Sequence, residues 1–352
     1  MTQADKRSLE EQLRRGEPVR KSALGGADLR GAMLAGGVFE RVDFRRADLS
    51  GADLSESIFE GCDFSGAQLV AARLDHGTWS KCVFESVAAE GVQAVHASLV
   101  ECRLARLSAP RSDLRHATFA QCALRELDLR ACDLTKANFA DCSEVSADFG
   151  RATLLETVFV QGDLSRASFS AVTADKIVFV KCAFGARDFG GAALPRCQFL
   201  ECDLGGARFD EAHLQNCGFR GSHLVGASLR RVVAPNALFV EAALDDAVLA
   251  EGLLTQALFA GARAAGADFS GARADQAIFI GADVTGARFI GTDLTYADFS
   301  GARLVAADFS HATLTRTRLH AVDDRGAVFT SRGAALGDDP DLREAEQWRP
   351  AV

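Results

Sequence analysis

The sequence lacks any long hydrophobic run, and no window approaches the ~18 consecutive apolar residues of a membrane-spanning helix. Its N-terminus has no apolar signal core, because Asp5, Glu10 and Glu11 lie among lysines and arginines. We therefore expect no membrane span and a cytoplasmic address. Proline is scarce, with 6 residues, whereas 48% of the chain is hydrophobic and 25% is charged. This balance is typical of a folded protein rather than a disordered one.

Signatures of catalysis are also missing. The sequence has no recognisable set of serine, histidine and carboxylate, no glycine-rich phosphate loop and no zinc-hydrolase motif. The 10 cysteines include no Cys-x-x-Cys pair. The net charge of −9 is mild and evenly spread, which argues against nucleic acid as a direct partner. We expect a protein that is not an enzyme and that needs no cofactor.

What the sequence does have is a period of five. From Leu24 to Phe329, residues whose number leaves a remainder of four on division by five are almost all Leu or Phe, and all 24 phenylalanines occupy this register. No insertion shifts it from one end of the repeat to the other. A helix needs apolar spacings of three and four, and a strand needs two. A strict period of five instead predicts a coil of short extended pieces joined by turns.

A small residue precedes each of these centres by two positions, as in the segments 47–51 and 297–301. All 10 cysteines occupy this small-residue position: Cys62, Cys82, Cys102, Cys122, Cys132, Cys142, Cys182, Cys197, Cys202 and Cys217. Free cysteine behaves as a small buried hydrophobe, so structural filling is the expected role. Because several of them recur in every fourth pentapeptide, a metal-binding or redox-active thiol column is the alternative.

The pattern resembles the pentapeptide-repeat family, whose unit is Ala-(Asp/Asn)-(Leu/Phe)-x-x. The resemblance covers residues 22–331 and implies an all-β fold, a right-handed four-sided parallel β-helix. The sequence supports four sides independently. Phenylalanine dominates the centres of every fourth pentapeptide from Phe39 to Phe299, and it is absent from the equivalent column of Leu34. We expect about 15 coils stacked at the ~4.8 Å spacing of strands.

Side-chain volumes indicate that both repeat positions point inward. Where a centre shrinks to alanine, as at Ala89, the residue two before it grows, here to Val87. Ala264 and Ala274 have no such compensation, so we expect the loosest coil there. Glu144 replaces a core Leu or Phe, and an uncompensated buried carboxylate is costly. We expect the coil to be distorted at Glu144.

The two ends depart from the repeat. Residues 1–21 are expected to form a capping helix and lead-in, with Ser8 and Glu11 as a capping box and Gly16 as the stop. Residues 22–331 are expected to form the β-helix. Residues 332–352 are expected to form a C-terminal tail, either frayed or with a short helix near 341–348.

One column of outward residues contains a candidate site. His76, His96 and His116 lie four pentapeptides apart, so three imidazoles on adjacent coils could reach one divalent metal ion. The alternative is a ladder of solvated turn residues. The sequence shows no further residue that would orient these histidines toward a metal.

A rigid, patterned surface without a pocket favours a non-enzymatic scaffold that binds other proteins, with an end-to-end homodimer as one arrangement. The resemblance implies two settings: an accessory or adaptor protein of a bacterial secretion system, or a DNA mimic that protects or inhibits a type II topoisomerase such as gyrase. Mimicry needs dense anionic columns, and the candidate interaction residues are Asp283, Asp293, Asp298 and Asp308. The richness in Ala, Arg and Gly is typical of a high-GC bacterial source.

Overall fold

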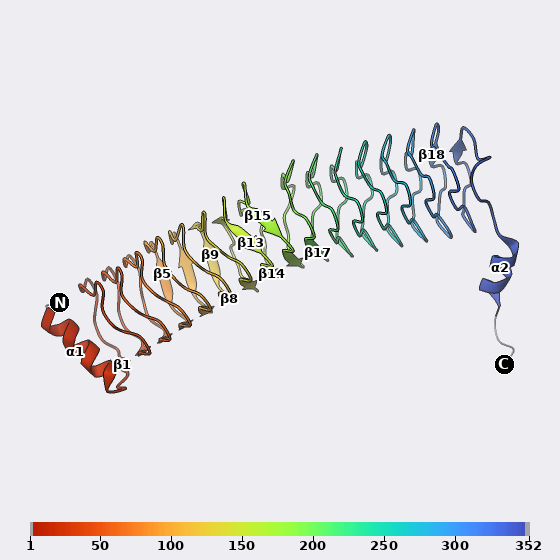
Figure 1. The fold of residues 1–352 in the computed structure, drawn as a ribbon. Coiled ribbons are helices and arrows are strands. Elements are labelled where there is room, and N and C mark those ends of the chain that lie inside the picture. Colours follow the sequence, from red (N-terminus) through yellow and green to blue (C-terminus); the bar gives the residue numbers. More distant parts are fainter. Residues whose placement is uncertain (1–2, 349–352) are drawn as a thin grey trace. The chain divides into compact units, whose positions relative to one another are not determined.

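The computed structural model of the chain describes residues 3–348, with the side chains of residues 6–346 and 348. Residues 1–2 and 349–352 of the expected lead-in and tail lie outside this described part. The chain divides into two compact units, residues 1–183 and 184–352, called unit 1 and unit 2. Each unit is a parallel β-solenoid (Figure 1). Together they contain about 16 turns, which confirms the expected β-helix of about 15.

Residues four pentapeptides apart lie on adjacent turns. Parallel bridges join Phe39 to Phe59 in unit 1 and Arg263 to Asp283 in unit 2. Repeat centres donate their N–H to a carbonyl of the next turn, as from Leu24 to the Asp43 oxygen at 2.8 Å. One turn therefore consists of four pentapeptides, which confirms the four sides.

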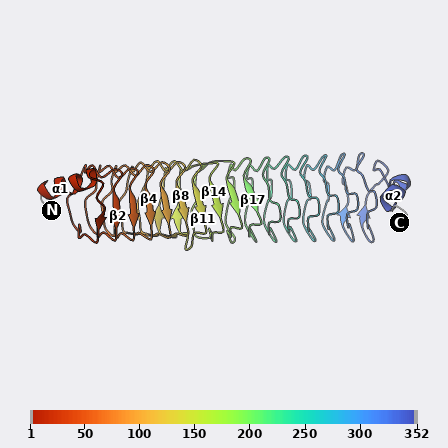
Figure 2. The same cartoon turned by 90° about the horizontal axis from the view of Figure 1, so that it is seen from below.

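One side of unit 1, called the strand side, is a continuous parallel sheet. Figure 2 shows β2, β4, β8, β11 and β14 side by side. In pairing order its strands are β1 (Val19–Arg20), β2 (Val38–Glu40), β3 (Ile58–Glu60), β4 (Thr78–Ser80), β6 (Ser98–Val100), β8 (Thr118–Ala120), β11 (Asn138–Ala140), β14 (Val158–Val160) and β16 (Val178–Val180).

The other sides of unit 1 contain shorter runs of strands. One run is β5 (Val83–Glu85), β7 (Arg103–Ala105) and β9 (Ala123–Arg125). Two pairs are β10 (Leu127–Asp128) with β12 (Ala147–Asp148), and β13 (Thr153–Leu155) with β15 (Thr173–Asp175). In unit 2 the turns are joined mainly by single bridges, and its strands are β17 (Gln198–Leu200), β18 (Asp308–Phe309) and β19 (Val328–Phe329).

The core of each unit is a stack of the repeat centres. Phe39 and Phe59 stack with ring centroids 4.6 Å apart and planes 4° apart, and Phe279 and Phe299 do so at 4.6 Å and 2°. Phenylalanines of adjacent sides meet edge to face, as Phe39 and Phe44 do at 5.6 Å. Such pairs add a modest stabilisation beyond the burial of apolar area.

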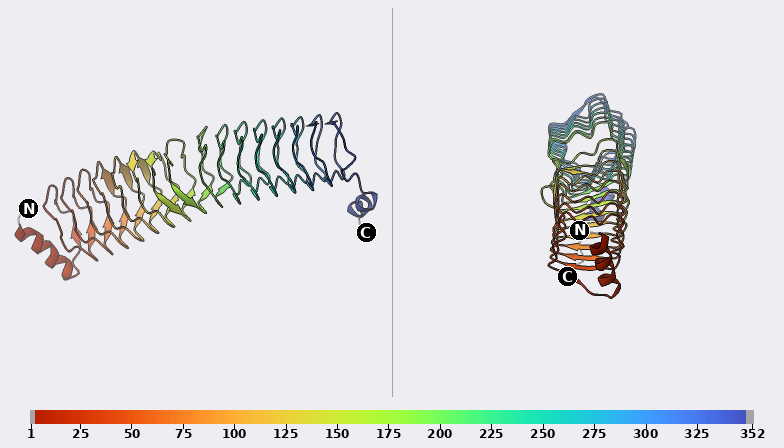
Figure 3. Two further views of the ribbon diagram at one scale, coloured as in Figure 1. Left: turned by 45° about the horizontal axis from the view of Figure 1, so that its top comes forward. Right: turned by 90° about the vertical axis from the view of Figure 1, so that its left-hand side faces the viewer.

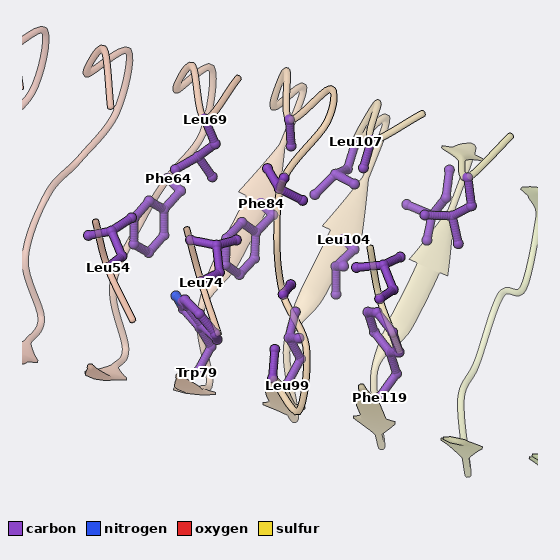
Figure 4. A pocket seen from close by; sticks show the side chains of 18 residues that line it. Leu54, Phe64, Leu69, Leu74, Trp79, Phe84, Leu99, Leu104, Leu107 and Phe119 are labelled. Carbon is purple, nitrogen blue, oxygen red and sulfur yellow. The ribbon is translucent and has the colours of Figure 1, made fainter. Parts of the chain in front are cut away.

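An apolar cavity of about 60 Å³ interrupts the core of unit 1. Ala89, Ala94 and Ala109 line it, together with larger side chains that Figure 4 shows converging from successive turns, among them Phe84 and Leu107. The enlarged residues that precede these alanines therefore do not fully replace the missing volume. The cavity lies in a different part of the chain from Ala264 and Ala274, where we expected the loosest coil.

The repeat slips by one residue at Glu144, which is the expected distortion. Glu144 has a left-handed backbone with φ of 53°, and its side chain is 62% exposed. Val145 takes the core position and is buried. The carboxylate lies 3.9 Å from the Arg125 guanidinium on the previous turn. Expelling the charge and burying the next residue avoids the cost of an unpaired buried carboxylate.

Helix α1 (Gln3–Arg14) packs against the first turn of unit 1 (Figure 3). Its Leu9 is buried, its Lys6 donates to the Arg30 carbonyl, and Glu10 accepts from the Met33 N–H at 3.0 Å. The helix begins well before Ser8, so the expected capping box at Ser8 is wrong. The residues ahead of Ser8 are mostly Gln, Ala, Lys and Arg, whose high helix propensity extends the helix toward the N-terminus.

Unit 2 ends in helix α2 (Pro340–Gln347), where the sequence left open a frayed tail or a short helix. Asp339 caps the helix by accepting from the Leu342 N–H at 3.1 Å. Before it, the Arg332 guanidinium lies 4.6 Å over the Phe329 ring and 2.5 Å from the Asp324 carboxylate. Asp324 thus has a partner at the last turn. Within residues 3–348, no helix is long and apolar enough to span a membrane.

Candidate interaction surface

The three candidate histidines stack on one another at a corner of unit 1. The rings of His76 and His96 are 5.1 Å apart with planes 15° apart, and those of His96 and His116 are 4.5 Å and 19° apart. All three side chains are exposed, and all three residues have left-handed backbones, with φ of 57° to 60°. The next corner residues in the column are Lys136, Glu156 and Lys176, and Glu156 lies 3.8 Å from both lysines.

The three stacked rings do not converge on one point. The lone pairs of an imidazole lie in the ring plane, so near-parallel stacked rings direct them side by side rather than toward one point. Among the residues that the structure describes, no group of three or more His, Cys, Asp or Glu side chains is arranged to hold a metal ion. The column is a ladder of turn residues.

The four candidate aspartates do not form a column. Their positions differ by one, two, three or five pentapeptides rather than by four, which places Asp283, Asp293, Asp298 and Asp308 on four different sides of unit 2. Each carboxylate accepts from the N–H two residues later, as from Thr285 at 3.0 Å. Each thus has a local structural role at the turn that follows it.

Arginines also offset the charge of these aspartates. Arg303 lies 3.7 Å from the carboxylate of Asp283, and Arg318 lies 3.1 Å from that of Asp298. Asp293 and Asp308 are bridged through the backbone to arginines on adjacent turns, Arg273 and Arg288. The expectation of an anionic Asp column in unit 2 is therefore wrong, because an arginine neighbours each aspartate along its side.

Six of the cysteines of unit 1, all except Cys132, complete the backbone hydrogen bonding beside the strand side. At corners that follow the other sides, a backbone hydrogen bond between residues of the same turn closes the corner, as from the Ala27 N–H to the Leu24 oxygen at 3.1 Å. We call this bond the turn bond. After the strand side, the Cys62 sulfur accepts from the Val42 N–H at 3.4 Å and donates to the Phe39 oxygen at 3.5 Å. The thiols that donate to the strand-side centre one turn earlier in the same way are Cys82, Cys102, Cys122, Cys142 and Cys182.

These thiols are poorly suited to chemistry. All 10 are buried, and none is in a disulfide. Burial raises the pKa of the Cys132 thiol to about 12 and that of Cys142 to about 11. The thiolate is the reactive and metal-binding form, so the protonated thiols of Cys132 and Cys142 are inert.

From β4 onward the strand side presents a face without charge, whereas β1 to β3 carry the outward residues Arg20, Glu40 and Glu60. Six of its strands, β4, β6, β8, β11, β14 and β16, each have an inward central residue flanked by two half-buried outward ones. The outward residues, all in the described part of unit 1, are uncharged: Thr78, Ser80, Ser98, Val100, Thr118, Ala120, Asn138, Ala140, Val158, Val160, Val178 and Val180. We call this set the uncharged face.

Charged and polar corner residues form the two edges of the uncharged face. One edge contains His76, His96, His116, Lys136, Glu156 and Lys176, and the other contains Lys81, Glu101, Gln121, Asp141, Gln161 and Lys181. All of these side chains are exposed. The face is therefore a neutral strip between two polar rims of mixed charge. The signal for it in the sequence is the lack of charge beside the centre of every fourth pentapeptide from Trp79 to Phe179.

The remaining sides of unit 1 are rich in ion pairs. Arg45 lies 2.7 Å from Asp43, and Arg115 lies 2.7 Å from Asp113. Hydrogen bonding to Arg45 lowers the pKa of the Asp43 carboxyl to about 2. A partner that binds through these sides must displace or desolvate such pairs, whereas the uncharged face imposes no such cost.

His320 is a further buried contact that the sequence does not reveal, because its position in the repeat is an ordinary outward one. In unit 2 its side chain is 2% exposed beneath the C-terminal segment. Its Nδ1 accepts from the Asp339 N–H at 3.1 Å and lies 3.0 Å from an Asp338 carboxylate oxygen. Its Nε2 lies 3.3 Å from Glu346. His320 thus connects the last turn to α2.

The chain is similar to known repeat proteins. The family model of pentapeptide repeats matches in 8 copies, over residues 23–61, 112–143, 253–289 and 282–320. No curated protein sequence matches. Among solved structures, HetL, a pentapeptide repeat protein involved in heterocyst differentiation regulation from the cyanobacterium Nostoc sp. strain PCC 7120, is 21% identical, with a TM-score of 0.29. That match covers 68% of this chain and 91% of HetL.

Two further structures show the range of the likeness. Full-length QnrB1, a plasmid-mediated fluoroquinolone resistance protein, is 19% identical over 55% of this chain and 91% of its own, with a TM-score of 0.29. The A-module of the mannuronan C-5 epimerase AlgE4 from Azotobacter vinelandii is 10% identical over 95% and 94%, with a TM-score of 0.28. Identities and TM-scores this low leave function to be argued from this chain's own surface. From its repeats and its turns of four pentapeptides, the chain is a pentapeptide-repeat protein.

Proposed function

We propose that the chain is a non-catalytic scaffold that binds a protein partner through the uncharged face of unit 1. The observation that supports this proposal is the run of six adjacent strands whose outward side chains include no charge, in a unit whose other sides are rich in ion pairs. Interface centres are depleted in charged residues and surrounded by a polar rim. The uncharged face between its two polar edges has this composition.

The geometry of the face favours a flat partner surface. Its strands are in register, with Val158 paired to Val178 and Val160 to Val180, so the outward side chains form straight ridges across the strands. Half-buried valine, alanine, serine and threonine offer shallow relief and lose little conformational entropy on binding. Such a face suits an extended contact rather than a small molecule, which needs a concave pocket.

Topoisomerase protection by DNA mimicry is the alternative with less support. The four aspartates that favoured it lie on different sides of unit 2 and have arginine neighbours. A mimic of the DNA backbone needs uninterrupted negative charge along one side. A gyrase supercoiling assay with the purified chain tests this alternative, and inhibition or protection at stoichiometric amounts would favour it over our proposal.

Affinity capture from the native cell tests the proposed function. The bait is the full chain, compared with Ala120→Lys, which places a charge in the centre of the face. Ala88→Lys is the matched control, because Ala88 is also outward and half-buried but lies on another side of unit 1. We expect a specific protein to be retained by the parent and by Ala88→Lys and to be lost with Ala120→Lys. This protein can be an untagged copy of the same chain. Secretion-system components among the retained proteins would identify the scaffold as an adaptor of that machinery.

One result of the capture experiment would contradict the proposal. If the proteins retained by parent, Ala120→Lys and Ala88→Lys are the same, the uncharged face is not the binding surface. Circular dichroism of all three proteins establishes that the solenoid is intact. Both lysines point outward, so we expect no loss of fold.

A further inference from the structure

We infer that the uncharged face of unit 1 binds a second copy of the same chain, sheet against sheet. The inference rests on the proposed function, since it names the partner of the same face. It differs from the end-to-end homodimer that the sequence suggested, in which coils would meet through their ends. Helix α1 covers the first turn of unit 1, with Leu9 buried against it, and so obstructs end-on contact at that end.

The surface of the uncharged face repeats from strand to strand. The strands of the uncharged face are paired in strict register from β4 to β16, so ridges of side chains recur at the ~4.8 Å strand spacing. Sheets that pack face to face interdigitate their side chains at ~10 Å separation. A second copy brings ridges of the same spacing, so every strand of the face finds an equivalent counterpart.

The charges of the face and of its edges also favour a second copy. The face itself carries none, and each edge contains both signs, as in Lys136 and Glu156 on one and Lys81 and Glu101 on the other. A second copy is therefore not repelled at the centre, and the rims offer opposite charges to each other. On the other sides, a symmetric contact would bury pairs such as that of Arg115 with its aspartate, which is costly.

The area of the face is that of a weak but specific contact. The six strands of the face at ~4.8 Å spacing give a length of ~29 Å, and one side of five residues with its corners is about 16 Å wide. Two such faces bury on the order of 1,000 Å² in total, the lower limit for a specific interface. The expected dimer is therefore weak, with a dissociation constant on the order of micromolar.

Sedimentation equilibrium of the full chain tests this inference, at concentrations from about 1 to about 200 μM, a range that brackets the expected constant. We expect a reversible monomer–dimer equilibrium. Ala120→Lys should weaken it at least about tenfold, because a buried unpaired charge opposes association. Ala88→Lys should leave it unchanged.

Thiol cross-linking locates the contact. Thr118→Cys introduces an outward thiol at the middle of the face, whereas all native thiols are buried. Under mild oxidation we expect a disulfide-linked dimer from Thr118→Cys. Ala88→Cys, on another side, should remain without a cross-link.

Three outcomes overturn the inference: a monomer at every concentration, an equal weakening by both lysine variants, or equal cross-linking of both cysteine variants. If the chain is monomeric while capture of another protein still depends on Ala120, this inference fails and the proposed function stands. If neither self-association nor capture responds to Ala120→Lys, both fail.

Discussion

At the residue scale, side chains at the small-residue position complete the hydrogen bonding of the corners. The Cys62 sulfur lies between a backbone donor and a backbone acceptor, whereas Cys132 donates to the Ala109 oxygen beside an intact turn bond. Hydroxyls also donate to a carbonyl of the previous turn: Ser57 to the Leu34 oxygen at 2.9 Å and Thr292 to the Phe269 oxygen at 2.8 Å. The donor is kept because a buried carbonyl without a partner is costly.

The buried thiols should be unreactive in the folded chain. Cys132 and Cys142 have raised pKa values, and alkylation requires an accessible thiolate. After brief treatment with iodoacetamide at pH 8, we expect intact-mass spectrometry to show no adduct on the native protein and 10 adducts in denaturant. A single cysteine that reacts as fast in the native protein as in denaturant would contradict this account.

Filling the cavity of unit 1 should stabilise the fold. Ala94→Val adds two methyl groups to an apolar space of about 60 Å³, and Val284 shows that a repeat centre accommodates valine fully buried. We expect the free energy of unfolding to rise by about 1 kcal/mol, somewhat less than the transfer of two methyl groups implies. Urea denaturation measures it.

Ala264→Val is the matched comparison for Ala94→Val. It adds the same volume at the coil that the sequence marks as the loosest, and Ala264 is buried in unit 2. We expect overpacking and no gain there. A larger gain at Ala264 than at Ala94 would show that the sequence had located the looser coil correctly.

At the element scale, the sequence determines the repeat better than the ends. Centres and small residues fix the register of four pentapeptides because each is required in every turn, and Glu144 could be recognised as a distortion because it breaks that rule. The start of α1 was wrong because Ser8 matches a capping box by composition alone. The contact of α2 with His320 could not be predicted, since it depends on where the tail folds back.

His320 should hold α2 on the last turn. In His320→Ala, the Asp339 N–H loses its acceptor and the Glu346 carboxylate loses its neighbour. We expect opening of the segment 338–346 to become easier by about 1–3 kcal/mol, the cost of unmade buried hydrogen bonds. Hydrogen exchange read by mass spectrometry should show faster exchange there and unchanged exchange in the core of unit 2.

His311→Ala is the control for His320→Ala, because His311 is an exposed corner residue of the same unit. It should leave exchange of the segment 338–346 unchanged. Equal acceleration in both variants would mean that α2 does not depend on the His320 contacts.

At the scale of the whole molecule, the candidate site was only partly visible in the sequence. The histidine spacing of four pentapeptides correctly indicated neighbours, but spacing cannot give ring orientation, and the stacked rings exclude convergence on one ion. The aspartate column was an error of register that the same spacing could have corrected. The uncharged face is present in the sequence, yet it is recognisable only when every fourth pentapeptide is taken as part of one surface.

Acid should destabilise the solenoid. Asp43, Asp113, Asp128 and Asp323 have lowered pKa values in the folded chain, in each case chiefly through hydrogen bonds from a nearby arginine. The unfolded chain therefore binds protons first, near the ordinary aspartate value of about 4. Their contribution to stability is complete above that pH and is lost as the pH falls toward about 2.

Thermal unfolding followed by circular dichroism at pH 7, 5, 3 and 2 measures this loss. Arg45→Gln and Arg115→Gln together should flatten the fall in Tm, because the partner carboxylates then titrate closer to their unfolded values. Arg151→Gln is the control, since Arg151 has no ion pair within the part of the chain that the structure describes. A Tm as high at pH 2 as at pH 7 would mean that these pairs contribute nothing.

The regular spacing of bridged residues also restricts how the chain can change its length. Deleting or duplicating four consecutive pentapeptides removes or adds one whole turn and leaves every downstream side chain on its own side. Deleting a single pentapeptide keeps the repeat intact but rotates everything after it by a quarter turn. The residues that continue the uncharged face would then lie on another side of the solenoid, and the face would be interrupted. The chain can therefore gain or lose length without disturbing its surfaces only in whole turns of four pentapeptides.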